Sequence, residues 1–341
     1  MIIKMVLVKI RSVLILWIIA LTTMVFCDVL DDSDEDYRQL VYYAKLASVA
    51  YCLKKGLQPG LLGDEQTRCP KTMCQEDEYK HIKLIKTFDF NDWGDVGSGF
   101  YAIDKEQKEI ILSFRGTSSR LDWLSDLDIM PVKYEPLINL QPFQKVEIEC
   151  HNCKVHRGFY KFLVKNCVSI IEETKQLKEK HPEYRLVILG HSLGAALTIL
   201  AGIEFQLMGY HPLIIAYACP KVGNGAFMQF ADKLFETSEL ADEIDSKHKF
   251  TKGFVRLSHT NDLVTQLPPS PVFKHGGYKY HIEKKLLPHL ASDIERRGIK
   301  DNEEHSDVTD MTFGKLFSNT RSKYAHSHYL IRMTGCDDNK L

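Results

Sequence analysis

The sequence lacks the features that mark several large classes of protein. It contains no block of lysine or arginine, and its formal net charge at pH 7 is −1. Because proteins that hold nucleic acid need a basic surface, this charge balance argues against such a partner. The sequence also lacks internal repeats, low-complexity tracts and any Asn-x-Ser/Thr sequon, so we do not expect N-glycosylation. What remains is an ordinary folding composition, with 44% hydrophobic and 26% charged residues.

The first 27 residues resemble a secretory signal. A positively charged start precedes an almost wholly apolar stretch, Ser12–Phe26, and an acidic stretch follows at once, Asp28–Asp36. This order predicts cleavage near Cys27, with residues 28–341 forming one domain that is secreted. The alternative is an uncleaved signal anchor in the secretory pathway, because apolar residues 5–8 lengthen the run towards a membrane span.

The nine cysteines fit an oxidising compartment. Their spacing predicts two local disulfides, Cys69–Cys74 and Cys150–Cys153. Cys52 lies near the start of the domain and Cys336 near its end, and a bridge between them is predicted to tie the two ends together. Cys167 and Cys219 lie in apolar stretches and are predicted to be buried free thiols. A zinc site on Cys150, Cys153 and His156 is the rival interpretation, but no fourth ligand is evident nearby, so we expect no metal.

Gly190-His191-Ser192-Leu193-Gly194 is the most informative segment of the chain. The apolar run 184–189 before it predicts a buried strand, and residues 193–208 after it, rich in alanine and leucine, predict a helix. A G-x-S-x-G pentapeptide between a strand and a helix is typical of a nucleophile elbow, which exposes the serine hydroxyl above the sheet. The pattern predicts Ser192 as a nucleophile and the Leu193 backbone N–H as an oxyanion donor.

Strands and helices alternate around this motif, which predicts an α/β fold with a mostly parallel sheet and helices on both faces. We expect helices near the start of the domain, beginning at residues 33–36, at 159–179 and near 226–235. Further strands are expected at 82–90, 99–103, 109–114, 213–218 and 254–258. The charged stretches 239–252 and 284–322 are interpreted as loop insertions, the second with a short helix at 286–296.

An activated serine needs a base and an acid that orients the base. In this fold they follow the serine in the order Asp or Glu, then His. Asp262 comes shortly after an expected strand, and His326 and His328 lie near the end of the chain. With 14 histidines in the sequence, composition alone leaves the base open.

Several ordered segments resemble the class 3 lipases of the fungal triacylglycerol-lipase type, over roughly residues 37–336. The matching segments are Phe114-Arg115-Gly116-Thr117, Val155-His156-Arg157-Gly158-Phe159, residues 190–194, Pro220-Lys221-Val222-Gly223-Asn224, Asp262-Leu263-Val264, Leu267-Pro268-Pro269, His275-Gly276-Gly277, Tyr278-Lys279-Tyr280-His281-Ile282 and the tail His326-Ser327-His328-Tyr329 with Thr334-Gly335 and Cys336. The resemblance implies an α/β-hydrolase fold with a helical lid and no cofactor.

The resemblance also implies roles for individual residues. Ser192 is the nucleophile, Asp262 the acid and His326 the base, with His328 as the second choice. Thr117 supplies the second oxyanion donor through its backbone N–H. Residues 118–129 match the family's lid, an amphipathic helix whose apolar face comprises Leu121, Trp123, Leu124 and Leu127.

Two departures from the family pattern stand out. Lys221 occupies the position of the family's usual arginine, which removes a bidentate partner there. The family's middle disulfide has no counterpart within 284–322.

The sequence therefore predicts a secreted acylglycerol lipase that meets lipid at a lipid–water interface and needs no obligate protein partner. Two other readings remain open at this stage: a phospholipase A1 or soluble carboxylester hydrolase, and a lipid-binding homologue without catalysis. The presence of Ser192, Asp262 and His326 argues against the last of these.

Overall fold

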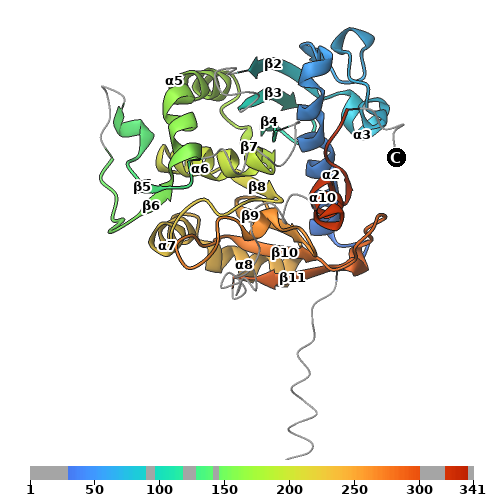
Figure 1. Cartoon of the computed structure of the whole chain (residues 1–341). Helices are drawn as coiled ribbons and strands as arrows, with labels where there is room; N and C mark the ends of the chain where they lie inside the picture. Colours follow the sequence, from blue (N-terminus) through green and yellow to red (C-terminus); the bar gives the residue numbers. More distant parts are fainter. Residues whose placement is uncertain (1–29, 90–96, 118–127, 141–145, 300–318, 337–341) are drawn as a thin grey trace, which may run out of the picture.

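The computed structural model of the chain describes residues 30–89, 97–117, 128–140, 146–299 and 319–336. A nine-stranded sheet forms its centre, in the order β1-β2-β3-β4-β7-β8-β9-β10-β11, with helices on both sides (Figure 1). Its strands are β1 (Gly60–Leu61), β2 (Lys83–Asp89), β3 (Ser98–Asp104), β4 (Glu109–Phe114), β7 (Arg185–His191), β8 (Leu213–Tyr217), β9 (Gly253–His259), β10 (Tyr278–Ile282) and β11 (Ile294–Gly298). Two small sheets accompany it: β5 (Pro131–Lys133) with β6 (Lys154–His156), and β12 (His328–Tyr329) with β13 (Ile331–Arg332).

The middle of the sheet is parallel and its margins are antiparallel. Strands β4, β7, β8, β9 and β10 run parallel to one another. At one margin β1, β2, β3 and β4 pair antiparallel in that order, and at the other margin β11 pairs antiparallel with β10. Because the carboxyl ends of parallel strands meet at one edge, residues that follow β4, β7 and β9 come together there. This architecture confirms the predicted α/β class.

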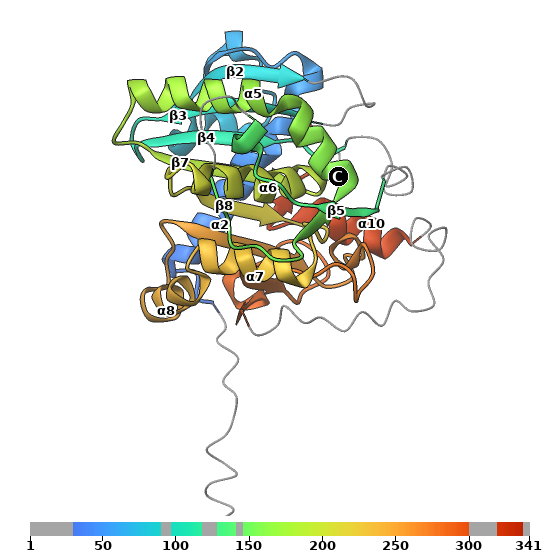
Figure 2. The same ribbon diagram turned by 90° about the vertical axis from the view of Figure 1, so that its left-hand side faces the viewer.

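Helices cover both faces of the sheet. Figure 2 shows α5 (Arg157–Lys180), α6 (Leu193–Leu207) and α7 (Gly225–Leu234) on the face towards the viewer. The opposite face carries α2 (Glu35–Val49) and α8 (Thr237–Lys247), whose apolar residues join a separate core cluster. The remaining helices, α3 (Asp77–Lys80) and α10 (Thr320–Ser327), are short.

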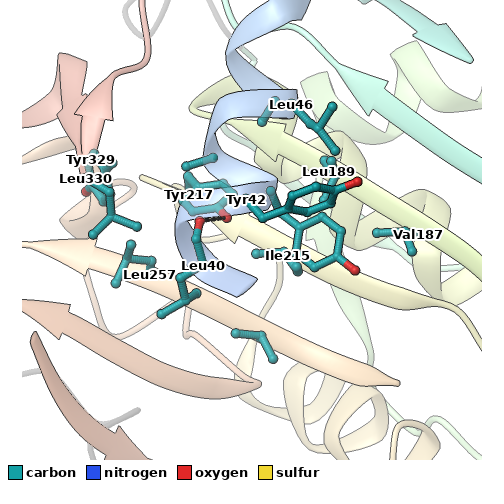
Figure 3. Packing of buried hydrophobic residues seen from close by; sticks show 14 of the residues in the cluster. Leu40, Tyr42, Leu46, Val187, Leu189, Ile215, Tyr217, Leu257, Tyr329 and Leu330 are labelled. Atoms are coloured by element: carbon teal, nitrogen blue, oxygen red, sulfur yellow. Dashed lines mark hydrogen bonds between the residues drawn. The ribbon is translucent and has the colours of Figure 1, made fainter. Parts of the chain in front are cut away.

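Side-chain alternation along the strands divides the core into two layers. In β7, Leu186 and Ile188 belong to the cluster under α5 to α7, and Val187 and Leu189 belong to the cluster under α2. Figure 3 shows the second cluster, in which the Tyr217 hydroxyl donates to the Leu40 carbonyl oxygen at 2.7 Å. Strands β7 and β8 at the middle of the sheet are buried on both faces, and their sequences contain continuous apolar runs at 186–189 and 213–217.

Two predicted segments differ from the structure. Residues 239–252, expected as a loop, begin within the helix α8, because Leu240, Ala241 and Ile244 form a narrow apolar stripe that packs against the sheet. Residues 286–296, expected as a short helix, contain only one turn of 3-10 helix at Ala291–Asp293 before strand β11 begins. The pairing of β11 with β10 overrides the weak helical pattern.

The segment Tyr278–Ile282, singled out in the sequence only as a motif, forms strand β10. The predicted signal segment, residues 1–27, lies outside the described residues. Within the part of the chain that the structure describes, no helix is long and apolar enough to cross a membrane.

Candidate active site

Ser192 lies at a sharp turn between β7 and α6. Its backbone has φ +61° and ψ −126°, a conformation that is strained for a residue with a side chain. The turn also brings two backbones into close contact: a Cβ atom on Gly194 would lie only 2.2 Å from the Phe114 carbonyl oxygen. A glycine is therefore required at this position, and the strain at Ser192 is held by the surrounding strands.

Three side chains from distant parts of the sequence meet at this turn. The His326 Nε2 atom lies 2.7 Å from the Ser192 Oγ atom, and the Nδ1 atom lies 3.0 Å from Asp262 Oδ2. Ser192 follows β7, Asp262 follows β9, and His326 lies in the last turn of α10. An ionised carboxylate only accepts, so Nδ1 carries the imidazole proton and Nε2 is free to accept the serine proton. This is the geometry of a nucleophile, a base and an orienting acid.

Asp262 is buried and has two further partners. The Tyr329 hydroxyl donates to Oδ2 at 2.6 Å, and the Val264 backbone N–H donates to Oδ1 at 3.0 Å. Hydrogen bonds of this kind stabilise the ionised carboxylate. Sequence analysis assigned no role to Tyr329, although its place three residues after His326 in the matched tail segment was a usable signal.

His328 faces away from the triad. Its ring stacks on that of Tyr324 with a centroid separation of 3.9 Å, and its Nδ1 atom lies 2.9 Å from the Tyr324 carbonyl oxygen. Partial burial lowers the pKa of His328. Of the two histidines considered from the sequence, only His326 contacts Ser192 and Asp262.

The two residues predicted as oxyanion donors, Leu193 and Thr117, lie on backbone segments near Ser192. Leu193 is the first residue of α6, where backbone N–H groups have no acceptor within the helix. Gly116, directly before Thr117, approaches so closely that a Cβ atom on it would lie 3.1 Å from the Ser192 Cβ atom. Thr117 is half-buried at the end of the segment that follows β4. Both donors thus lie on segments adjacent to the nucleophile.

Lys221 anchors the segment that follows Asp262. Its ammonium group donates to the Gln266 carbonyl oxygen at 3.0 Å and to the Ser270 Oγ atom at 3.1 Å. Its backbone N–H donates to the Leu267 carbonyl oxygen at 2.6 Å. Lysine at this position therefore makes contacts that hold the loop between β9 and β10.

All three expected cysteine pairs are disulfide-bonded in the structure. Their Cα atoms lie 4.9 Å apart in Cys52–Cys336, 6.3 Å in Cys69–Cys74 and 5.6 Å in Cys150–Cys153. Cys167 and Cys219 are buried and free. No group of three or more potential metal ligands occurs among the described residues, and the cysteines of the rival zinc interpretation are bonded to each other.

The predicted lid side chains Leu121, Trp123, Leu124 and Leu127 lie outside the described residues. The structure resumes at Asp128, whose carboxylate pairs with Arg157 at the start of α5. Ile129 and Met130, which follow, expose 40% and 56% of their surfaces. Ile129 is the last residue of the predicted lid and Met130 follows it, so apolar surface is exposed at that end of the segment; residues 128 and 129, expected as helix, are not helical.

Comparisons with known proteins identify the family of this chain. Residues 111–272 match the sequence model of the family described as Lipase (class 3). A Saccharomyces cerevisiae protein named "Putative lipase LIH1" is 34% identical over 312 residues, which cover 88% of this chain and 94% of that protein. The "Secreted mono- and diacylglycerol lipase A" of Penicillium cyclopium is 29% identical over 242 residues, covering 70% of this chain and 67% of that one.

Solved structures give the same result. The nonglycosylated LIP2 lipase of Yarrowia lipolytica superposes with a TM-score of 0.71 at 26% identity, covering 89% of this chain and 96% of that chain. The fold is therefore the α/β-hydrolase fold of the fungal lipases. The chain belongs to the class 3 lipase family, and it is a carboxylic ester hydrolase.

Proposed function

We propose that this protein is a secreted serine esterase that hydrolyses acylglycerol esters at lipid–water interfaces through an acyl-enzyme on Ser192. The observation that carries the proposal is the continuous contact from Ser192 Oγ through the His326 imidazole to Asp262, at 2.7 and 3.0 Å. Both distances suit direct proton transfer and orientation of the base.

In the first half of the reaction, the Ser192 oxygen attacks the ester carbonyl carbon and its proton passes to His326 Nε2. The bond from that carbon to the alcohol oxygen then breaks, and Nε2 returns the proton to the departing alcohol. In the second half, a water oxygen attacks the acyl carbon while His326 takes the water proton. The bond to Ser192 then breaks, and the serine regains its proton as the fatty acid leaves.

Each tetrahedral intermediate carries a negative charge on the former carbonyl oxygen. The backbone N–H groups of Leu193 and Thr117 stabilise this oxyanion in the proposed mechanism, and the Thr117 hydroxyl adds a third possible donor. Asp262 steadies the imidazolium that forms at His326, and it remains ionised throughout.

Two lines of support favour lipid esters as substrates. Relatives of this chain are named mono- and diacylglycerol lipases. The predicted lid, residues 118–129, has an amphipathic sequence beside Thr117, and its last residue Ile129 and the following Met130 are exposed apolar side chains. A helix of this kind would cover the acyl site in water and move aside on a lipid surface.

Secretion is supported by the signal-like residues 1–27, by three disulfides and by relatives whose names include the word "secreted". A phospholipase A1 or a soluble carboxylester hydrolase is the second candidate, because the same triad serves any accessible ester.

A hydrolysis panel tests the proposal. The protein is assayed on emulsified triacylglycerol and diacylglycerol, on phosphatidylcholine vesicles and on a dissolved short-chain ester, with Ser192→Ala as the matched control. We expect the emulsions to be the best substrates and the control to be inactive. Preferred release of one fatty acid from the vesicles would favour the phospholipase, and turnover of the dissolved ester alone would favour the soluble hydrolase. Absence of turnover combined with failure of an organophosphonate to label Ser192 would contradict an esterase of any kind.

A further inference from the structure

His191, the residue before the nucleophile, lies completely buried between two other parts of the site. Its Nε2 atom lies 2.7 Å from the backbone carbonyl oxygen of His326. Its Nδ1 atom lies 2.6 Å from the Tyr51 hydroxyl oxygen. The ring itself is close to the His326 ring, with 4.9 Å between their centroids. One side chain therefore connects the nucleophile strand to the segment that carries the base.

The protonation state of the His191 ring follows from its hydrogen-bond partners. A carbonyl oxygen can only accept, so Nε2 of His191 must carry the proton. Burial lowers the pKa of His191 to about 3, so the ring is neutral in the neutral and alkaline range. The Nδ1 atom is then an acceptor, and the Tyr51 hydroxyl must donate to it. Burial also raises the pKa of Tyr51, which keeps that hydroxyl protonated.

The hydrogen bond from His191 gives the His326 carbonyl oxygen a donor that α10 itself does not offer. Helix α10 ends at Ser327, and the last four carbonyl groups of a helix have no N–H donor within that helix. The His326 carbonyl is one of them. The donor from His191 therefore holds the backbone of the base at the point where the helix ends, opposite Ser192.

Tyr51 reaches the oxyanion segment as well. It lies in the 3-10 helix Ala50–Lys55, and a Cβ atom on Gly116 would be 2.5 Å from its hydroxyl oxygen and 2.7 Å from the His191 carbonyl oxygen. Gly116 directly precedes Thr117, the expected oxyanion donor. The same hydroxyl thus packs against one functional segment while it orients His191 towards another.

We propose that Tyr51 and His191 are positioning residues that hold the His326 backbone and the Gly116–Thr117 segment in register with Ser192. The inference rests on the proposed serine-esterase function. The His326 carbonyl sets the tautomer, and Tyr51 fixes the ring: without its hydroxyl, the buried Nδ1 atom loses its donor and the His191 ring can turn away from the His326 carbonyl. Both side chains are buried, so we expect their removal to lower the rate of the chemical step and to leave substrate binding unchanged.

The test compares Tyr51→Phe with wild type on a dissolved ester, p-nitrophenyl butyrate, so that lipid-interface effects do not contribute. We expect kcat to fall about ten-fold, the loss that corresponds to one hydrogen bond, with KM unchanged. His191→Gln, whose amide can donate and accept but lacks the rigid ring that spans both partners, should lose activity to a similar or greater extent. The matched control is Tyr101→Phe, which removes a buried hydroxyl that donates to the Ile170 carbonyl at 2.9 Å, far from the triad. This control variant should lose stability and keep the kcat of wild type.

A second measurement separates this inference from the proposed function. Nitrogen-15 NMR of the histidines in the full protein should show His191 as the neutral Nε2–H tautomer from pH 5 to 9, and a changed Nδ1 chemical shift in Tyr51→Phe, because Nδ1 loses its donor. A charged ring or an Nδ1–H tautomer in wild type would overturn the inference, as would wild-type kcat in Tyr51→Phe. If wild type cleaves no ester, the proposed function fails on its own, and the tautomer still decides the inference.

Discussion

The Tyr329 hydroxyl donates to the Asp262 carboxylate at 2.6 Å, so the acid of the triad is itself held by a third side chain. Asp262 has almost no exposed surface, which means that its charge depends on hydrogen bonds rather than on water. The bond from Tyr329 and the bond from His326 both reach Oδ2, and together they fix the plane of the carboxylate.

Replacing Tyr329 with phenylalanine should lower kcat on the order of ten-fold or more and change KM little, because a hydrogen bond to a charged group contributes roughly 1.5–3 kcal/mol. Steady-state kinetics on a dissolved ester measure this loss. The matched control is Tyr280→Phe, which also removes a hydroxyl bond to a buried carboxylate, that of Asp36 at 2.8 Å, away from the triad. If both variants lose the same activity, the role of Tyr329 is general stability.

Substitution of the two neighbouring histidines, His326 and His328, should affect activity very differently. Ser192→Ala, Asp262→Asn and His326→Ala should each lose on the order of 10³-fold or more in kcat, whereas His328→Ala should keep most activity. The physical reason is contact, since His328 stacks on Tyr324 and does not reach Ser192. Initial rates with folding checked by circular dichroism measure the effect. An inactive His328→Ala beside an active His326→Ala would reverse the assignment.

Glu204 should make stability depend on pH. Burial in α6 raises its pKa from 4.5 to about 7, despite hydrogen bonds from the Tyr134 hydroxyl at 2.7 Å and the Leu137 backbone N–H at 2.8 Å. Because the folded state prefers the protonated acid, its contribution to stability is fully present below pH 4.5. That contribution is lost as the pH rises to about 7.

Glu204→Gln should therefore remove a decline in stability between pH 4.5 and 7 that wild type shows. Tm measured across that range, for wild type and variant, tests the sign. The exposed Glu172 on α5 provides the control, since Glu172→Gln should leave the pH dependence of wild type intact. A parallel pH dependence in wild type and Glu204→Gln would contradict the assignment.

The Cys52–Cys336 disulfide closes a loop with a sequence separation of 284. Chain entropy predicts a stabilisation on the order of 5 kcal/mol for a loop of this size, against about 2 kcal/mol for the five-residue separation of Cys69–Cys74. The double variant Cys52→Ala/Cys336→Ala should thus lower the denaturation midpoint more than Cys69→Ser/Cys74→Ser does. Non-reducing peptide mapping provides the direct check, and free thiols at Cys52 and Cys336 would exclude the bridge.

The lid predicted from the sequence should respond to lipid. Activity on a short-chain ester should rise sharply once the ester exceeds its solubility and forms droplets. Trp123→Ser should reduce this rise while barely changing turnover of dissolved ester, because the lost indole contributes only to contact with lipid. A smooth saturation curve through the solubility limit would indicate a soluble-ester hydrolase instead.

Some features of this protein were determined by its sequence alone. The nucleophile elbow could be predicted because a strand, a turn that needs glycine and a helix follow one another within 25 residues, so the constraint is local. Strands β7 and β8 could be predicted equally well, because both are buried on both faces and contain an unbroken apolar run. The cysteine pairs at separations of five and three residues could also be predicted from the sequence, because their spacing is local.

Other features depend on segments that are distant in the sequence, and only the tertiary structure decided them. Helix α8 is stabilised by contact of three residues with the sheet, and β11 by its pairing with β10, so neither has a strong local pattern. The resemblance of the tail segment named His326 as the base and His328 as the second choice, but the direction of each ring depends on tertiary contacts of α10, such as the one between the Ala325 carbonyl oxygen and His259 Nδ1 at 3.0 Å. The bonds from Tyr51 to His191 and from Tyr329 to Asp262 join residues 140 and 67 positions apart, a separation at which no periodicity or spacing constrains a contact.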